Sequence, residues 1–322
     1  MAATATIAAP TKARKFLGLL RSGDQITHLI TLIFALSVLL VTIFLVYELW
    51  IHSEPSRTKF GFSFLWGRTW DPIAEKFGAL PFIYGTVLTS LVALLISVPL
   101  GVGAAIFLSE LAPPKLSNAC TFLVELLAAV PSVIFGLLAI FTLVPLLRTY
   151  VEPALKATLG FLPLFQGPAV GVGYLAAGMI LAIMTFPFII SISREALIAV
   201  PREQREAALA LGATKWESTW QVVVPFAKLG IIGSVFLALA RALGETMAVT
   251  MVIGNDTAIH TSLLAPGYTI AAIIANEFTE ATGDAHLSAL VELGLVLFVL
   301  TMILNASARL LIVATTRKGS KH

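Results

Sequence analysis

Long apolar runs separated by short polar segments set the pattern of this chain. Runs of about 20 or more apolar residues, the length that crosses a hydrocarbon core as a helix, fall at residues 28–50, 83–109, 121–147, 169–193, 229–253 and 289–314. The pattern predicts an all-α, polytopic membrane protein with six transmembrane helices. Pro99, Pro131 and Pro187 lie inside these runs. In lipid such breakers survive where neighbouring helices or a cavity satisfy the freed backbone groups, so we expect a packed bundle that lines a pathway.

One further apolar segment, Tyr268–Phe278, is too short to cross a membrane. Its Ile270, Ile273, Ile274 and Phe278 recur at helical spacing and form one apolar face. We expect this segment to be a short helix that lies in the outer interface or dips back into the bundle.

The longest polar interlude in the second half of the chain is Glu206–Pro225. The residues that follow Pro201 are strong helix formers, and Pro201 suits a first helical position. Gly212 can adopt the left-handed conformation that ends a helix. Thr214 and Glu217 have the T-x-x-E spacing of a capping box, which starts the next helix. The interlude is predicted to be two short helices that meet at Gly212.

The distribution of Lys and Arg predicts the orientation of the chain. Basic residues concentrate in the first 27 residues, in segment 194–228 and at the C-terminus, whereas loop 254–288 has no Lys or Arg and carries several Asp and Glu. Because cytoplasmic loops carry the excess of positive charge, both termini and loop 194–228 are predicted to be cytoplasmic. The expected organisation is a cytoplasmic tail, residues 1–27, followed by a transmembrane domain, residues 28–322.

Composition narrows the class of protein. Of the 322 residues 58% are hydrophobic and 12% are charged, whereas soluble domains carry about a quarter charged residues. A net charge of +3 is too small to indicate a nucleic-acid partner, and a single cysteine, Cys120, excludes an intramolecular disulfide framework. The lipid bilayer is therefore the expected environment.

Motifs of catalysis are missing from the sequence. It contains no G-x-x-x-x-G-K-[ST], H-E-x-x-H or G-x-S-x-G pattern and no pair of cysteines for a metal. We therefore expect no catalytic residue, no metal site and no cofactor in this chain. If the protein moves a solute uphill, the energy source is not an ATPase site in this chain.

The most informative charges inside the apolar runs are Arg241 and Glu245. They are four residues apart and are therefore expected on one face of a helix. An arginine at mid-membrane costs about 2.5–3.5 kcal/mol even on the lenient insertion scale, so its side chain should face the bundle interior. One interpretation is an internal ion pair that holds the helix against a neighbour. The favoured interpretation is a pathway site, because a guanidinium offers a bidentate fork to an oxyanion.

The polar interlude resembles the EAA loop of ABC-importer permeases, whose pattern is E-A-A, three residues, G, nine residues, then I-x-L-P. Val222 and Val224 stand where Ile and Leu are usual. In that family the loop is a pair of coupling helices that seats in a groove of a separate cytoplasmic ATPase. The resemblance implies that the ATPase docks on Glu206, Ala207, Ala208, Gly212, Thr214, Glu217 and Pro225.

Longer segments are similar to the phosphate ABC-transporter permeases of Pst type, and among them to the PstC-type subunits. The segments are FGALPFIYGT, PLGVGAAIFLSE, ELLAAVPSVIFGL and RALGETMAVTMVIGN. This resemblance implies the type I, MetI-like permease architecture and a place in the inner or plasma membrane of a prokaryote. It also implies that inorganic phosphate is the cargo and that Arg241, Glu245 and Thr246 line its pathway.

The partners that the resemblance implies are a second permease of PstA type, a homodimeric ATPase of PstB type and an extracytoplasmic phosphate-binding protein of PstS type. A regulator of phosphate signalling is a further partner that the sequence leaves open. Two alternatives also stay open: the same mechanism with sulfate or molybdate as cargo, and a stand-alone secondary transporter. The EAA-like loop argues against the second, because a carrier working alone has no need of a surface for an ATPase.

Overall fold

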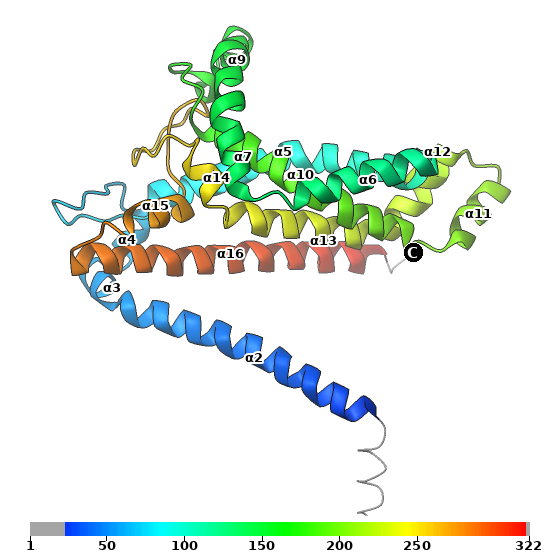
Figure 1. The fold of residues 1–322 in the computed structure, drawn as a ribbon, viewed down its shortest axis with the longest axis horizontal. Helices are drawn as coiled ribbons and strands as arrows, with labels where there is room; N and C mark the ends of the chain where they lie inside the picture. Colours follow the sequence, from blue (N-terminus) through cyan, green and yellow to red (C-terminus); the bar gives the residue numbers. More distant parts are fainter. Residues whose placement is uncertain (1–22, 320–322) are drawn as a thin grey trace, which may run out of the picture. The chain divides into compact units, whose positions relative to one another are not determined.

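The computed structural model describes residues 23–319 and, by its internal contacts, divides the chain into two units, residues 1–52 and 53–322 (Figure 1). The described part of the first unit is one helix, α2 (Gly23–His52). It carries no Asp, Glu, Lys or Arg between Gln25 and Tyr47, which suits a helix surrounded by lipid. Residues 1–22 of the predicted cytoplasmic tail lie outside the described residues, and the boundary predicted at residue 27 stays a prediction.

The second unit is helical. Its described residues form no β-strand, and two isolated β-bridges are their only β-structure. Its elements in chain order are α3 (Glu54–Phe60), α4 (Ser63–Trp66), α5 (Leu80–Ile106), η1 (Phe107–Leu111), α6 (Pro114–Ala128), α7 (Ser132–Leu138), η2 (Ala139–Leu143), α8 (Val144–Leu146), η3 (Leu147–Val151), α9 (Glu152–Leu159), η4 (Pro163–Phe165), α10 (Tyr174–Ile198), α11 (Arg202–Ala210), α12 (Lys215–Ser218), η5 (Thr219–Val223), α13 (Val224–Leu243), α14 (Met247–Thr250), α15 (Ile270–Glu277) and α16 (Asp284–Gly319).

Helix α10 is the centre of this unit and packs against α5, α6 and α13 (Figure 1). Close approach depends on small residues. A Cβ atom at Gly178 of α10 would lie 2.4 Å from Val92 Cγ1, and one at Gly101 of α5 would lie 2.7 Å from Ile189 Cγ2. A buried 2.8 Å hydrogen bond between the hydroxyls of Ser193 and Ser234 joins α10 to α13. Backbones that come this close allow the extensive side-chain packing that holds helices together in lipid.

Six helical stretches among the described residues are long and apolar enough to cross a membrane, which confirms the predicted number. They run over Thr27–His52, Leu80–Leu111, Ser132–Leu159, Tyr174–Ile198, Lys215–Leu243 and Asp284–Ser307.

The predicted boundaries of the third stretch were wrong. The apolar run at 121–147 is split between two helices, since α6 ends at Ala128 and α7 begins at Ser132. Pro131 causes the break because it has no backbone N–H and disfavours the helical conformation of the residue before it. Beyond Pro131 the chain stays helical as far as Leu159, and the end of this stretch, α9, projects away from the long helices of the unit (Figure 1).

The fifth stretch was also misplaced. It was predicted at 229–253, but the helix starts at Lys215 and ends at Leu243, with Gly244 as its C-cap residue. The polar residues at its start made the helix look shorter than it is. The apolar residues after Gly244 belong instead to the separate short helix α14 and to the loop that follows.

The short helix predicted at Tyr268–Phe278 is α15, and it dips into the bundle. Ile270, Ala271, Ala272 and Ile273 are buried, and α15 packs against α16, α14 and α5. Its start is capped by Thr269, whose hydroxyl accepts a hydrogen bond from the N–H of Ala272 at 3.3 Å.

Candidate functional site

The first candidate surface is the polar segment between α10 and α13. Helix α11 begins at Arg202, and Pro201 is its N-cap residue rather than its first helical residue as predicted. Gly212 follows the helix with φ +89°, the left-handed conformation expected of it. A Cβ atom there would meet no atom within 4 Å. The backbone conformation, and not crowding, is therefore what favours glycine at this position.

The predicted capping box is present at the start of α12. The N–H of Glu217 donates to Thr214 Oγ1 at 3.2 Å, and the N–H of Thr214 donates to Glu217 Oε2 at 2.8 Å. Helix α12 then continues through η5 into α13, with Pro225 in the first turn of α13. The second of the two predicted helices is therefore the beginning of a membrane-spanning helix, so a force on α12 acts directly on α13.

Helix α11 presents its side chains to the outside. None of its residues is buried, and Glu206 and Ala207 are exposed. Leu209 is 43% exposed and Leu211, directly after the helix, is 90% exposed. Figure 1 shows α11 and α12 at one end of the second unit, remote from α14 and α15. An exposed helix with apolar side chains at the end of a bundle is the kind of surface that a partner protein covers.

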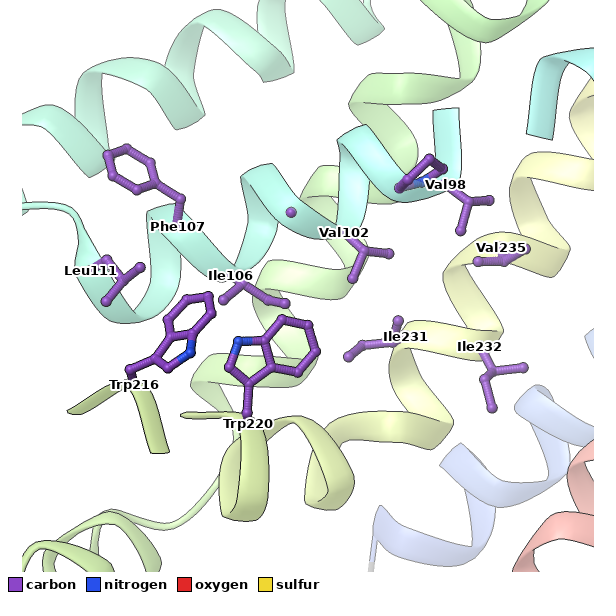
Figure 2. A pocket seen from close by; sticks show the side chains of 12 residues that line it. Val98, Val102, Ile106, Phe107, Leu111, Trp216, Trp220, Ile231, Ile232 and Val235 are labelled. Atoms are coloured by element: carbon purple, nitrogen blue, oxygen red, sulfur yellow. The ribbon is translucent and has the colours of Figure 1, made fainter. Parts of the chain in front are cut away.

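An apolar groove of about 620 Å³ lies beside α12 (Figure 2). Its lining comes from α5, η1, α12, η5 and α13, and includes Pro99, Ile106, Trp216, Trp220 and Val235. The two indole rings lie 5.5 Å apart with a 70° angle between their planes. Because the lining offers almost no polar surface, this groove is not a site for an anion.

The second candidate site is Arg241, in the last turn of α13. Its Cζ lies 4.4 Å from the centre of the Phe188 ring of α10, a cation–π contact. Its Nε is buried and has no hydrogen-bond partner among the described residues. A guanidinium that is held by an aromatic face and keeps an unused donor is suited to bind an oxyanion.

Glu245 does not share a helical face with Arg241, so that prediction was wrong. Helix α13 ends at Leu243, and Glu245 lies beyond it. Glu245 Oε1 accepts a long, 3.4 Å hydrogen bond from the N–H of Ala248, and no ion pair joins it to Arg241 in the described part of the chain. Thr246 is the N-cap residue of α14, and its hydroxyl donates to the carbonyl of Gly244 at 3.4 Å. All three predicted pathway residues therefore lie at the break between α13 and α14.

Two helix breaks come close together here. Helix α14, which follows the break at Gly244, packs against α7, which follows the break at Pro131 (Figure 1). A Cβ atom at Gly136 of α7 would lie 2.4 Å from Met251 Sδ and 3.2 Å from Ala248 Cα. Broken helices at membrane depth occur where the freed backbone groups are buried in protein or line a cavity. This architecture fits a translocation pathway.

The loop between α14 and α15 carries a fixed negative charge. Asp256 accepts hydrogen bonds from the N–H of Ala258 and from His260 Nε2, each at 2.9 Å. Partial burial raises the pKa of Asp256, but the hydrogen bond from Ala258 and the neighbouring His260 outweigh it and leave the pKa below its usual value. Within the described residues no group of three or more His, Cys, Asp or Glu could hold a metal ion.

The sequence reasoning missed Arg205 and Glu110. They form an ion pair of 2.8 Å that joins α11 to η1. Since 95 positions separate them, only a folded structure brings them together. The one signal in the sequence was that Glu110 ends an apolar run.

Residues 97–317 match the family described as "Binding-protein-dependent transport system inner membrane component". The phosphate transport system permease protein PstC of Mesorhizobium japonicum is 50% identical over 290 residues, which are 89% of this chain and 89% of that relative.

Two solved structures are similar in fold. One is a bacterial alginate ABC transporter in complex with a periplasmic protein, with a TM-score of 0.56, 16% identity and coverage of 89% of this chain and 96% of that chain. The other is the MetNI methionine ABC transporter in an inward-facing conformation, with a TM-score of 0.53, 16% identity and coverage of 76% and 99%. The predicted all-α architecture of an ABC-importer permease is confirmed.

Proposed function

The chain belongs to the family of binding-protein-dependent transport system inner membrane components, and from this premise we propose that it is the permease subunit of an ATP-driven importer of inorganic phosphate. The observation that carries the proposal is the 50% identity, over 89% of both chains, to a relative named as a phosphate transport system permease. The protein is multi-pass and its place is the inner membrane, as its family description and its six apolar helices indicate.

The sequence has no nucleotide-binding motif, so we assign the hydrolysis of ATP to another subunit. A separate ATPase, a homodimer of PstB type, binds and hydrolyses ATP, and this chain is not catalytic. The docking surface is the α11–α12 segment with Glu206, Ala207, Ala208, Gly212, Thr214, Glu217 and Pro225. The exposure of α11 and the continuity of α12 with α13 support this assignment. A docked ATPase then moves α13 directly, and the predicted orientation places the segment, together with both termini, in the cytoplasm.

Arg241 provides the transient cationic site on the pathway. A phosphate oxygen accepts hydrogen bonds from the guanidinium, while the Phe188 ring keeps that group in place. Glu245 and Thr246 lie at the same helix break. The carboxylate of Glu245 repels the anion and prevents it from being trapped, and it can accept a proton of a P–OH group. Sulfate has no such proton at neutral pH, so the pair favours phosphate over sulfate.

The remaining partners complete the pathway. A second permease of PstA type closes the other side, and an extracytoplasmic binding protein of PstS type delivers phosphate to the outer face. Movement of the two ATPase subunits rocks the pair of permeases between outward and inward access. The acidic outer loop around Asp256 repels free anions, which makes delivery by a binding protein necessary.

The test is reconstitution of the chain with its ATPase and second permease in liposomes. We expect binding protein loaded with phosphate to stimulate ATP hydrolysis and uptake of labelled phosphate, with little competition by excess sulfate or molybdate. Equal competition by sulfate would overturn the assignment of the cargo. Phosphate flux by this chain alone, driven by an ion gradient, would overturn the assignment as an ABC subunit.

A further inference from the structure

Helix α11 has little to hold it against the rest of the protein. Within it only Arg205 and Ala208 are partly buried, and the other residues are exposed. An alanine has no polar group and little surface. Apart from the packing of α11 against α12 and η5, the attachment of the proposed docking helix therefore depends on one long side chain, that of Arg205.

Every nitrogen of the Arg205 guanidinium donates a hydrogen bond. Nε and Nη2 reach Glu110 Oε2 and Oε1 at 3.2 and 2.8 Å, which makes the contact bidentate. Nη1 donates to the carbonyl of Val200, and Nη2 also donates to the carbonyl of Leu197 at 2.7 Å. Leu197 lies in the last turn of α10, and Val200 follows its C-cap residue, Ala199. Both carbonyls therefore lie at the C-terminal end of the helix, where the helix dipole favours a cation.

The pair is sheltered from solvent. Only 21% of the Arg205 side chain and 12% of the Glu110 side chain are exposed. A charge pair with this little exposure is screened less by salt than a surface pair, and removal of one member leaves the other without compensation. A lysine at position 205 could not replace the guanidinium, because an ammonium has no planar fork for the carboxylate and the two carbonyls.

The helices that meet at Arg205 are packed tightly against one another. Directly beside the ion pair is a buried apolar cluster that joins α5 and the end of α10 to η5 and the start of α13. Its buried members are Ala105, Ile106, Leu197, Val200, Val223 and Ala227. Farther along, Gly101 lets α5 and α10 pack in close contact. A displacement of the inner ends of α5 and α10 is therefore shared by both helices along their length.

We propose that Arg205 and Glu110 form the tie through which a movement of α11 is transmitted to α5 and α10. Arg205 is a positioning residue: it does not touch the transported anion, and its place inside the fold turns it away from the exposed face of α11. The chain then has two routes from the docking segment into the bundle, one through the continuous α12–α13 helix and one through this tie. The inference rests on the proposed docking of an ATPase on α11 and names the residue that makes the docking productive.

The primary experiment compares Arg205→Ala, Glu110→Ala and the double variant in the reconstituted complex with its ATPase and partner permease. We expect the ATPase to co-purify and to hydrolyse ATP, while the phosphate transported per ATP falls about fivefold or more in each single variant, the size of an ordinary coupling between sites. The double variant should be no worse than the single ones, because both remove the same contact. Additive losses, or an unchanged transport ratio, would overturn the tie.

A matched control is Arg202→Ala, which removes the same type of cation from the same helix. Arg202 is exposed, and no hydrogen bond or ion pair of its side chain occurs within the described residues. Its transport ratio should equal that of the unchanged protein. A loss as large as that of Arg205→Ala would show that charge on the docking helix, and not the tie, sets the ratio. Glu110→Ala keeps the test decisive if Arg205→Ala does not assemble, because Glu110 is not on the docking helix.

A rescue experiment separates transmission from mere folding. Cysteines at positions 205 and 110, in a chain with Cys120→Ser, are bridged by a thiol-specific cross-linker that reduction can cleave. We expect the bridge to restore the transport ratio and reduction to abolish it again within the same assembled vesicles. No recovery on bridging would contradict the tie. If the unchanged complex does not import phosphate at all, the proposed cargo fails instead, which is a different outcome.

Discussion

Arg241 belongs to a helical stretch that is long and apolar enough to cross a membrane, where a charged side chain is costly, and no carboxylate among the described residues pairs with it. Its positive charge is stabilised by the ring of Phe188, which is a weaker partner than a carboxylate and leaves the hydrogen-bond donors available. A residue kept for structure alone would be expected to have its donors satisfied. The unused Nε therefore supports the proposal that a transient anion is its partner.

Substitution of Arg241 by Lys should separate charge from shape. The variant keeps a cation but loses the bidentate fork and the flat contact with Phe188, so we expect phosphate uptake to fall about tenfold, the cost of one or two charge-assisted hydrogen bonds. The measurement is the initial rate of uptake by assembled complexes in liposomes. Arg309→Lys is the control, because Arg309 is exposed near the end of α16, and its rate should not change. Normal uptake by Arg241→Lys would refute the pathway role.

Two glycines of α5 show that single small residues decide how closely two helices pack. Gly101 faces Ile189 of α10, whereas Gly103, two residues later, has no atom within 4 Å of the place where a Cβ would be. The same substitution therefore has opposite consequences at the two positions, although the sequence around them is uniformly apolar.

Gly101→Ala should destabilise the protein and Gly103→Ala should not. The added methyl group at 101 would overlap Ile189, which costs about 1–3 kcal/mol by overpacking. At 103 the methyl group is free, and the gain in helix propensity is about 0.5–1 kcal/mol. The measurement is the midpoint of thermal denaturation of the purified chain, followed by gel filtration. Equal midpoints for the two variants would contradict the prediction, because they would mean that the space between Gly101 and Ile189 can hold a methyl group.

The elements show what a sequence can and cannot predict. Apolar length identified six membrane helices, and local chemistry identified the helix ends at Gly212 and Thr214, because both signals lie within a few residues. The same approach misplaced the third and fifth helices, because an apolar run does not tell where a helix breaks. The error at Gly244 then carried over to Glu245, because its predicted place on the same helical face as Arg241 assumed an uninterrupted helix. The tie between Arg205 and Glu110 needed the packing of three helices and could not be predicted.

In the second unit as a whole, the proposed docking surface and the proposed entry side for the anion lie at opposite ends. Helices α11 and α12 lie at one end, and α4, α15 and the loop before α5 lie at the other (Figure 1). Basic residues concentrate at the first end and acidic ones in the loop beside the second. The positive-inside rule predicts that the first end is cytoplasmic. In the proposed mechanism a movement that starts at the docking surface therefore has to travel the length of the helices, past the breaks at Pro131 and Gly244, before it changes access from the outer face.

Two single cysteines test this orientation and the docking surface together. Ile73 and Leu211 are 97% and 90% exposed and lie at opposite ends, so each is replaced by Cys in a chain with Cys120→Ser. A membrane-impermeant maleimide should label position 73 only from outside intact cells, and position 211 only in inside-out vesicles. Co-expression of the ATPase should protect position 211 and leave position 73 unaffected, because an ATPase seated on α11 covers Leu211. Labelling of 211 from outside would reverse the proposed topology, and labelling that the ATPase does not reduce would place the docking surface elsewhere.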